Sequence, residues 1–198
     1  MDIPMDADVL CVDGFGGHSV HVVLDPEKQI ITHLIVKMGL VGIERLVPIE
    51  MVSETMPASI QLVCTVDELK QMPPFVYNQF IKPSEPFSPV AGGGVLVAPY
   101  SILEQRPLLV ECEQIPEGEL VVGKGAAVEA LDGPVGHVTE FLIDSPPEGK
   151  ITYLVAEEGH FWNRKHLKIP ALEIDHFGDD VIYLKLAKEV VEAKDSGQ

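Results

Sequence analysis

The residues best suited to metal chemistry in this sequence are its histidines, and their spacing argues against a shared site. His18 and His21 are three positions apart, so on an extended strand their side chains point to opposite faces. His160 and His166 could approach each other across a hairpin loop, but no cysteine pair or third histidine lies near them in the sequence. We therefore expect no bound transition metal.

Aspartates are the second set that could do chemistry, and each has a structural explanation. Asp13 and Asp132 precede glycine, where a tight turn favours aspartate, and Asp25 and Asp144 end apolar runs. General acid-base catalysis is therefore not expected of them. The glycines at 92–94 are followed by no Lys-Ser/Thr pair, and no serine or cysteine lies in a nucleophile-elbow pattern. The sequence predicts neither an enzyme nor a bound cofactor.

Three cysteines remain to be explained. Cys11, Cys64 and Cys112 lie in or beside apolar runs, and their odd number does not suit a disulfide framework. We expect them to be buried free thiols in a reducing cytoplasm.

An internal repeat dominates the organisation of the chain. The stretch 13–18, Asp-Gly-Phe-Gly-Gly-His, recurs at 132–137 as Asp-Gly-Pro-Val-Gly-His, and each copy runs into an alternating apolar strand that ends in aspartate. Further on, Ile-Thr-His-Leu-Ile at 31–35 aligns with Ile-Thr-Tyr-Leu-Val at 151–155, and insertions fall at turns. Each copy therefore reads as one folded unit, with a tight Asp-Gly turn between two strands. We name residues 8–72 the first repeat and residues 125–193 the second repeat.

These patterns predict an all-β fold with short helices. Each repeat shows five short strands and then a short charged helical pattern, and in the first repeat Thr65 and Glu68 form a capping-box signature. Sharply turned strands of this length avoid exposed edges by closing on themselves, so we expect two small β-barrels, each closed by a helix. The predicted domains are barrel 1 over 1–73, a linker over 74–124 and barrel 2 over 125–198.

The predicted linker differs from the repeats in composition. It is rich in proline and carries aromatic residues such as Phe75, Tyr77 and Phe80, whereas a flexible Gly/Ser linker would lack the aromatics. Its aromatics either cover the barrels or form a partner-binding arm. The apolar stretches 108–110 and 120–122 could each supply a strand that leads into the second barrel.

The charge of the chain limits its partners. The formal net charge is -17 over 198 residues, which argues against direct binding of nucleic acid and against docking on anionic lipid. No apolar run is long enough for a membrane span, and the N-terminus does not resemble a secretory signal. We expect a cytoplasmic protein, whether free or at the periphery of a membrane complex.

The repeated motifs resemble the PRC-barrel family. The resemblance rests on Asp-Gly-x-x-Gly-His, the apolar strand that ends in aspartate, the Ile-Thr-x-Leu strand and the following Val-Pro at 47–48 or Ile-Pro at 169–170. That family includes the cytoplasmic domain of the photosynthetic reaction-centre H subunit and the C-terminal domain of a ribosome maturation factor. The resemblance covers both repeats but not the linker. It implies a compact β-barrel used for assembly or docking, with no catalytic residues.

Two loops are the predicted sites of protein contact. They follow the third strand of each repeat, where scaffold packing leaves the sequence free to differ. One loop is apolar and the other combines aromatic and basic residues, which are frequent at interface hot spots. The candidate contact residues are Leu40, Val41, Ile43, Arg45, Phe161, Trp162, Arg164 and Lys165. The competing interpretation is that Trp162 folds back onto its own barrel.

The sequence therefore predicts a non-enzymatic interaction module that docks on a larger cytoplasmic complex through a protein partner. The alternative is a peripheral subunit of a membrane photosynthetic or redox complex, which would tune electron or proton transfer as an H-subunit domain does. A homo-oligomer is compatible with both readings.

Overall fold

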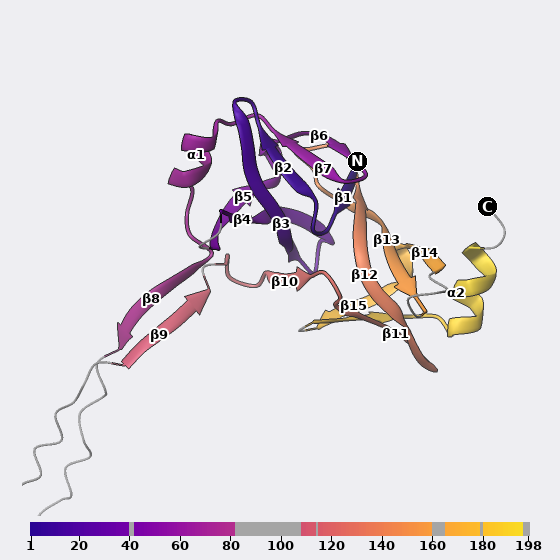
Figure 1. Cartoon of the computed structure of the whole chain (residues 1–198). Helices are drawn as coiled ribbons and strands as arrows, with labels where there is room; N and C mark the ends of the chain where they lie inside the picture. Colours follow the sequence, from indigo (N-terminus) through magenta and orange to yellow (C-terminus); the bar gives the residue numbers. More distant parts are fainter. Residues whose placement is uncertain (40–41, 82–107, 114, 160–164, 179, 196–198) are drawn as a thin grey trace, which may run out of the picture. The chain divides into compact units, whose positions relative to one another are not determined.

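The structure is a computed structural model that describes residues 1–39, 42–81, 108–113, 115–159, 165–178 and 180–195. They form two compact units, Met1–Phe75 with Ile115–Gln198 and Val76–Gln114. The smaller unit is an antiparallel pair of strands, β8 (Val76–Ile81) and β9 (Leu108–Glu113). The larger unit is mainly β and holds one sheet for each repeat (Figure 1), which confirms the predicted β class.

The first sheet has the order β5-β4-β3-β2-β7-β6. The sequence predicts five strands here, and the structure has a sixth, because a 3-10 turn separates β6 from β5. In this sheet β2 and β7 pair in parallel, and the other neighbouring strands pair antiparallel. The elements are β2 (Asp8–Cys11), β3 (Gly14–Asp25), β4 (Ile30–Met38), β5 (Ile43–Pro48), η1 (Ile49–Met51), β6 (Val52–Met56), β7 (Ser59–Leu62) and α1 (Val66–Gln71).

The second sheet repeats this topology in the order β14-β13-β12-β11-β16-β15. Its one parallel pairing, β11 with β16, matches that of β2 with β7. The elements are β11 (Ala127–Ala130), β12 (Gly133–Ile143), β13 (Ile151–Glu158), β14 (Lys165–Pro170), η2 (Ala171–Glu173), β15 (Ile174–Gly178), β16 (Val181–Leu184) and α2 (Lys188–Asp195). The two repeats therefore share one order of elements and one order of strands.

The nearly continuous apolar sequence of β4 follows from burial on both of its faces. Leu34 and Val36 lie in the main hydrophobic core, whereas Ile35 lies in a smaller cluster with Leu46 and Phe75. A half-exposed strand would instead alternate apolar and polar residues. β4 is accordingly an inner strand of its sheet, since it pairs with both β3 and β5.

Both Asp-Gly turns also anchor the helix of their repeat. A carboxylate oxygen of Asp13 accepts the backbone N–H of Val66 at 2.8 Å, and one of Asp132 accepts that of Lys188 at 2.7 Å. Because the first amides of a helix have no partner within it, each aspartate satisfies one of them and fixes where the helix begins. The capping box at Thr65 is confirmed and holds the same end of α1.

The two repeats exchange strands. The N-terminal strand β1 (Asp2–Pro4) pairs with β12 of the second repeat, and β10 (Leu120–Gly123) pairs with β3 of the first (Figure 1). Each of these strands directly precedes the repeat that it does not join. The stretch 120–122, which could supply a strand that leads into the second barrel, does lie in a strand, but that strand extends the first sheet, because it pairs with the part of β3 that β2 does not reach.

The exchange obeys a two-fold relation between the repeats. Asp2 lies opposite Leu142, and Val121 lies opposite Val23, the residue of the first repeat that is equivalent to Leu142. At the centre of the relation, Ile31 N donates to Gly149 O at 2.9 Å and Ile151 N donates to Gln29 O at 2.8 Å. The sequence repeat is thus also a symmetric pairing of the two halves in space.

One hydrophobic core serves both sheets. Ile3 from β1 is buried with Phe141 and Leu154 of the second repeat, and the same cluster contains Leu24 and Leu34 of the first. Ser19 helps to fix the N-terminal segment, because its hydroxyl donates to Pro4 O and accepts Ala7 N, both at 3.0 Å. The repeats are therefore expected to unfold together although each has its own sheet.

Shortening a buried side chain of the exchanged strand β1 should destabilise the whole larger unit. We expect Ile3→Ala to lower the free energy of unfolding by about 2–4 kcal/mol, because it leaves a cavity at a fully buried position. Urea unfolding followed by circular dichroism should show a single transition at a lower midpoint. The exposed neighbour gives the control, since Asp2→Ala should change the stability by less than about 0.5 kcal/mol. Two separate transitions, of which only one moves, would contradict the shared core.

Candidate functional site

The structure describes three of the eight residues predicted to contact a partner. Ile43 begins β5 and is 49% exposed, Arg45 lies two residues further along that strand, and Lys165 is exposed at the start of β14. The other five lie outside the described residues: Leu40, Val41, Phe161, Trp162 and Arg164.

Ile43 and Arg45 belong to a hollow on the first repeat, which we call the apolar hollow. It has a volume of about 420 Å³ and lies where β3, β4, β5 and α1 meet. Phe15, 53% exposed, is its largest side chain, and its ring meets that of His18 edge-on at 5.2 Å. The lining residues are Phe15, Gly16, Met38, Gly39, Ile43, Arg45, Val66 and Lys70. An exposed aromatic ring in an apolar recess is typical of a protein contact site.

Charge at the apolar hollow differs from that of the whole chain. Its lining includes two cations, Arg45 and Lys70, and no carboxylate, although the chain has 31 acidic and only 14 basic residues. Arg45 is held in place, because one terminal nitrogen donates to Met72 O at 2.9 Å. Lys70 pairs with Asp67 at 2.8 Å on the exposed side of α1. An incoming group would therefore meet the fixed positive charge of Arg45 beside an apolar surface.

The equivalent place on the second repeat has the opposite character. In the paired strands, Met38 lies opposite Ile43, and Glu158 lies opposite Lys165 in the same register. Val66 and Lys188 are equivalent as well, because each begins its helix on a turn aspartate. Where the first repeat has Met38 and Val66, the second has the ion pair of Glu158 with Lys188, at 2.5 Å. The same backbone therefore carries an apolar hollow in one copy and a salt bridge in the other.

The histidines and aspartates singled out in the sequence lie apart. His18 is exposed beside Asp8 at 3.1 Å, His21 stacks on Phe75, and His137 contacts the carbonyl of Gly125. Asp25 accepts two backbone amides of its turn and pairs with Lys28, whose hydrogen bond lowers the pKa of the carboxyl. Within the described part of the chain, no three His, Cys, Asp or Glu side chains are grouped to hold a metal ion.

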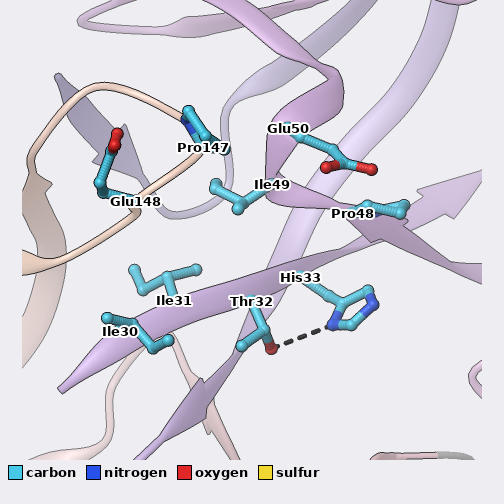
Figure 2. A pocket seen from close by; sticks show the side chains of 9 residues that line it. All are labelled: Ile30, Ile31, Thr32, His33, Pro48, Ile49, Glu50, Pro147 and Glu148. Atoms are coloured by element: carbon cyan, nitrogen blue, oxygen red, sulfur yellow. Dashed lines mark hydrogen bonds between the residues drawn. The ribbon is translucent and has the colours of Figure 1, made fainter. Parts of the chain in front are cut away.

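A second hollow lies where the two repeats meet. It has a volume of about 350 Å³ and is formed by β4, the η1 turn and the loop before β13. Figure 2 shows His33 at one side, with its ring against Thr32, and Glu148 across the hollow from it. The lining residues are Ile30, Ile31, Thr32, His33, Pro48, Ile49, Glu50, Pro147 and Glu148.

Thr32 connects this hollow to the segment before β10. Its hydroxyl is placed to donate to a carboxylate oxygen of Glu119 at 2.5 Å, and Nδ1 of His33 lies 3.0 Å from the same hydroxyl. Burial lowers the pKa of His33, although Glu119 and Glu50 act in the opposite direction. These contacts tie the entry of the exchanged strand to β4, and we assign them a structural role.

Comparison with protein-family models and with curated protein sequences finds no match. None of the helices in the described ranges is long and apolar enough to cross a membrane.

The sequence did not predict the apolar hollow as a whole. Ile43 and Arg45 were expected as loop contacts, but Phe15, Met38 and Val66 were not, since they come from three separate elements. Their departure from Pro134, Glu158 and Lys188 in the aligned repeat was the signal that could have found them.

The pKa shift of His33 predicts a pH dependence of stability. Because its folded pKa lies below the unfolded value of 6.5, the unfolded chain binds protons more readily, so stability falls as the pH drops below about 6.5. Between pH 7 and pH 5, the unfolding free energy of wild type should therefore decrease relative to that of His33→Gln. Urea titrations at each pH measure it. A shift in favour of the wild type would mean that attraction to Glu119 outweighs burial.

Proposed function

We propose that this chain is a non-enzymatic protein-interaction module, built from two PRC-type barrels, that docks on a larger cytoplasmic complex through the apolar hollow. The observation that carries the proposal is the contrast between the repeats at this position. A fold that tolerates the ion pair of Glu158 with Lys188 does not require Met38 and Val66 to expose an apolar recess. Their presence is better explained by a ligand than by stability.

Chain connectivity supports the barrel form. The end strands of the first sheet, β5 and β6, are joined only by the η1 turn of three residues. Six strands laid flat would span about 24 Å between the end strands, whereas the chain from Pro48 to Val52 reaches at most about 14 Å. Curling of the sheet towards closure would reconcile these two lengths, and the η2 turn supports the same form for the second sheet.

The partner that fits the apolar hollow is a polypeptide with an apolar side chain next to a carboxylate. Phe15, Ile43 and Val66 offer apolar contact, and burial of a large side chain there would contribute about 1.5–3 kcal/mol. Arg45 and Lys70 lie in the same lining, so an acidic neighbour on the partner is favoured and a basic one is disfavoured. The acidic remainder of the surface discourages acidic partners that lack the apolar anchor.

An exchange of side chains between the repeats tests the proposal. We expect Met38→Glu with Val66→Lys, which gives the first repeat the ion pair of the second, to weaken partner binding by about 2 kcal/mol or more, roughly 30-fold. Quantitative mass spectrometry of proteins captured from the native host identifies the partner as the one lost with this variant. Titration with the purified partner then gives the dissociation constant.

The mirror variant is the matched control. Glu158→Met with Lys188→Val alters the second repeat by the reverse change and should leave partner binding intact. The proposal is wrong if both variants capture the same proteins as wild type. It is equally wrong if the two variants weaken capture alike, since the contrast between the repeats would then carry no function.

The predicted loop contacts need a separate measurement. Trp162→Ala with Arg164→Ala should also weaken binding by about 2 kcal/mol or more with little change in melting temperature if that loop is a hot spot. Normal binding, or unfolding of this variant, would remove the loop from the interface and leave the apolar hollow as the contact.

A further inference from the structure

Two cysteine thiols touch in the core of the first repeat. Cys11 ends β2, and Cys64 follows β7, its parallel neighbour, where Cys64 O accepts Val12 N at 3.1 Å. Both side chains are buried and free, as the sequence predicts for them, and the neighbouring Cys64 helps to raise the pKa of Cys11. Residues far apart in the sequence thus present two sulfur atoms at one point.

More sulfur lies at the entrance to this pair. Cys64 lines a surface hollow of about 360 Å³, whose other lining residues are Met51, Val63, Glu68 and Met72. Glu68 is engaged in the capping box of α1, so the donors that remain are the thiol and two thioethers. Thiolates bind both Cu(I) and zinc, but protein ligands of zinc are cysteine, histidine and carboxylate, so a set that adds two thioethers favours monovalent copper.

The fold itself does not require these sulfur atoms. The second repeat has Ala130 where Cys11 stands, since each lies just before the Asp-Gly turn, and Leu186 where Cys64 stands, because Leu186 O accepts Leu131 N as Cys64 O accepts Val12 N. Met51 O accepts Val63 N just as Glu173 O accepts Lys185 N, so Glu173 replaces Met51. Continued along the helix, the alignment places Lys194 at Met72. All four sulfur positions change together.

We propose that Cys11 and Cys64, with Met51 and Met72, form a binding site for Cu(I). The ion reaches Cys64 through the hollow and then bonds to both sulfur atoms. Two Cu–S bonds form, two S–H bonds break and two protons pass to solvent, with no change in oxidation state. The thioethers add neutral donors and shield the ion from water. The histidine spacing that predicts no metal does not bear on this site, because only the fold gathers its ligands.

The thiols of Cys11 and Cys64 are protonated in the metal-free protein, so they are poorly suited to sensing peroxide. Burial and the neighbouring Cys64 raise the pKa of Cys11 to about 12, and burial raises that of Cys64 as well. Peroxide reacts with thiolates, which are scarce here at neutral pH. A soft cation can instead displace the protons, because the new bonds to sulfur compensate for deprotonation.

A competition titration tests the proposal on the full chain. Cu(I) is supplied as its coloured bicinchoninate complex, without oxygen and with ascorbate as reductant. Wild type should withdraw one equivalent of Cu(I) and release about two protons for it. Zn(II), titrated in the same way against a zinc indicator, should bind far more weakly. Retention of all copper by bicinchoninate, or equal affinity for zinc, would overturn the site.

Variants taken from the second repeat locate the ligands. Cys11→Ala with Cys64→Leu should weaken Cu(I) binding by more than about 100-fold, beyond the 10–100-fold that outer-shell changes cause. Met51→Glu with Met72→Lys should weaken it less, and Cys112→Ser should leave it unchanged. Unchanged binding by the double cysteine variant, or loss of binding with Cys112→Ser, would assign copper elsewhere. X-ray absorption of copper-loaded wild type needs no variant: sulfur neighbours support the site and only nitrogen or oxygen neighbours contradict it.

Discussion

The reciprocal exchange of two short strands is the constraint on which the rest of this structure depends. A repeat of this length buries only a modest apolar core by itself. β1 places Ile3 among the core residues of the second repeat, and β10 places Val122 against β3 of the first. Because each half supplies part of the other's core, the two sheets are stabilised as one body.

The exchange also makes the two repeats a controlled comparison. Strand order, turn aspartates and cross-repeat hydrogen bonds are the same in both, so the backbone imposes the same demands at equivalent positions. Where side chains still differ in character, stability alone does not explain the difference. The ion pair of Glu158 with Lys188, which stands where the first repeat has Met38 and Val66, is one such place. The sulfur residues around Cys64 are another.

Both differences fall on the first repeat and near its helix. The apolar hollow includes Val66 and Lys70 of α1, and the sulfur site lies where the chain enters and leaves that helix, at Cys64 and Met72. Leu69 of the same helix is fully buried. This proximity suggests that copper and partner binding should be measured together, since both would act on the packing of the same short helix.

Local sequence by itself determined the repeat, the Asp-Gly turns, the capping box at Thr65 and the β class of the fold. These features depend on residues close in the chain, so periodicity and turn chemistry are sufficient to predict them. The sequence also predicted Ile43 and Arg45 as contact residues within a loop that differs between the repeats, and the structure places both in the lining of the apolar hollow.

Only the tertiary structure decided which strands lie side by side. The stretch 120–122 has the apolar pattern of a strand, but nothing in that pattern says that it joins β3 rather than the sheet of its own repeat. In the same way, only the parallel pairing of β2 with β7 brings Cys11 to Cys64, and only the meeting of β3, β4 and α1 brings Phe15, Met38 and Val66 together. The physical reason is that long-range pairing is selected by the burial of a shared core, which no local stretch of sequence encodes.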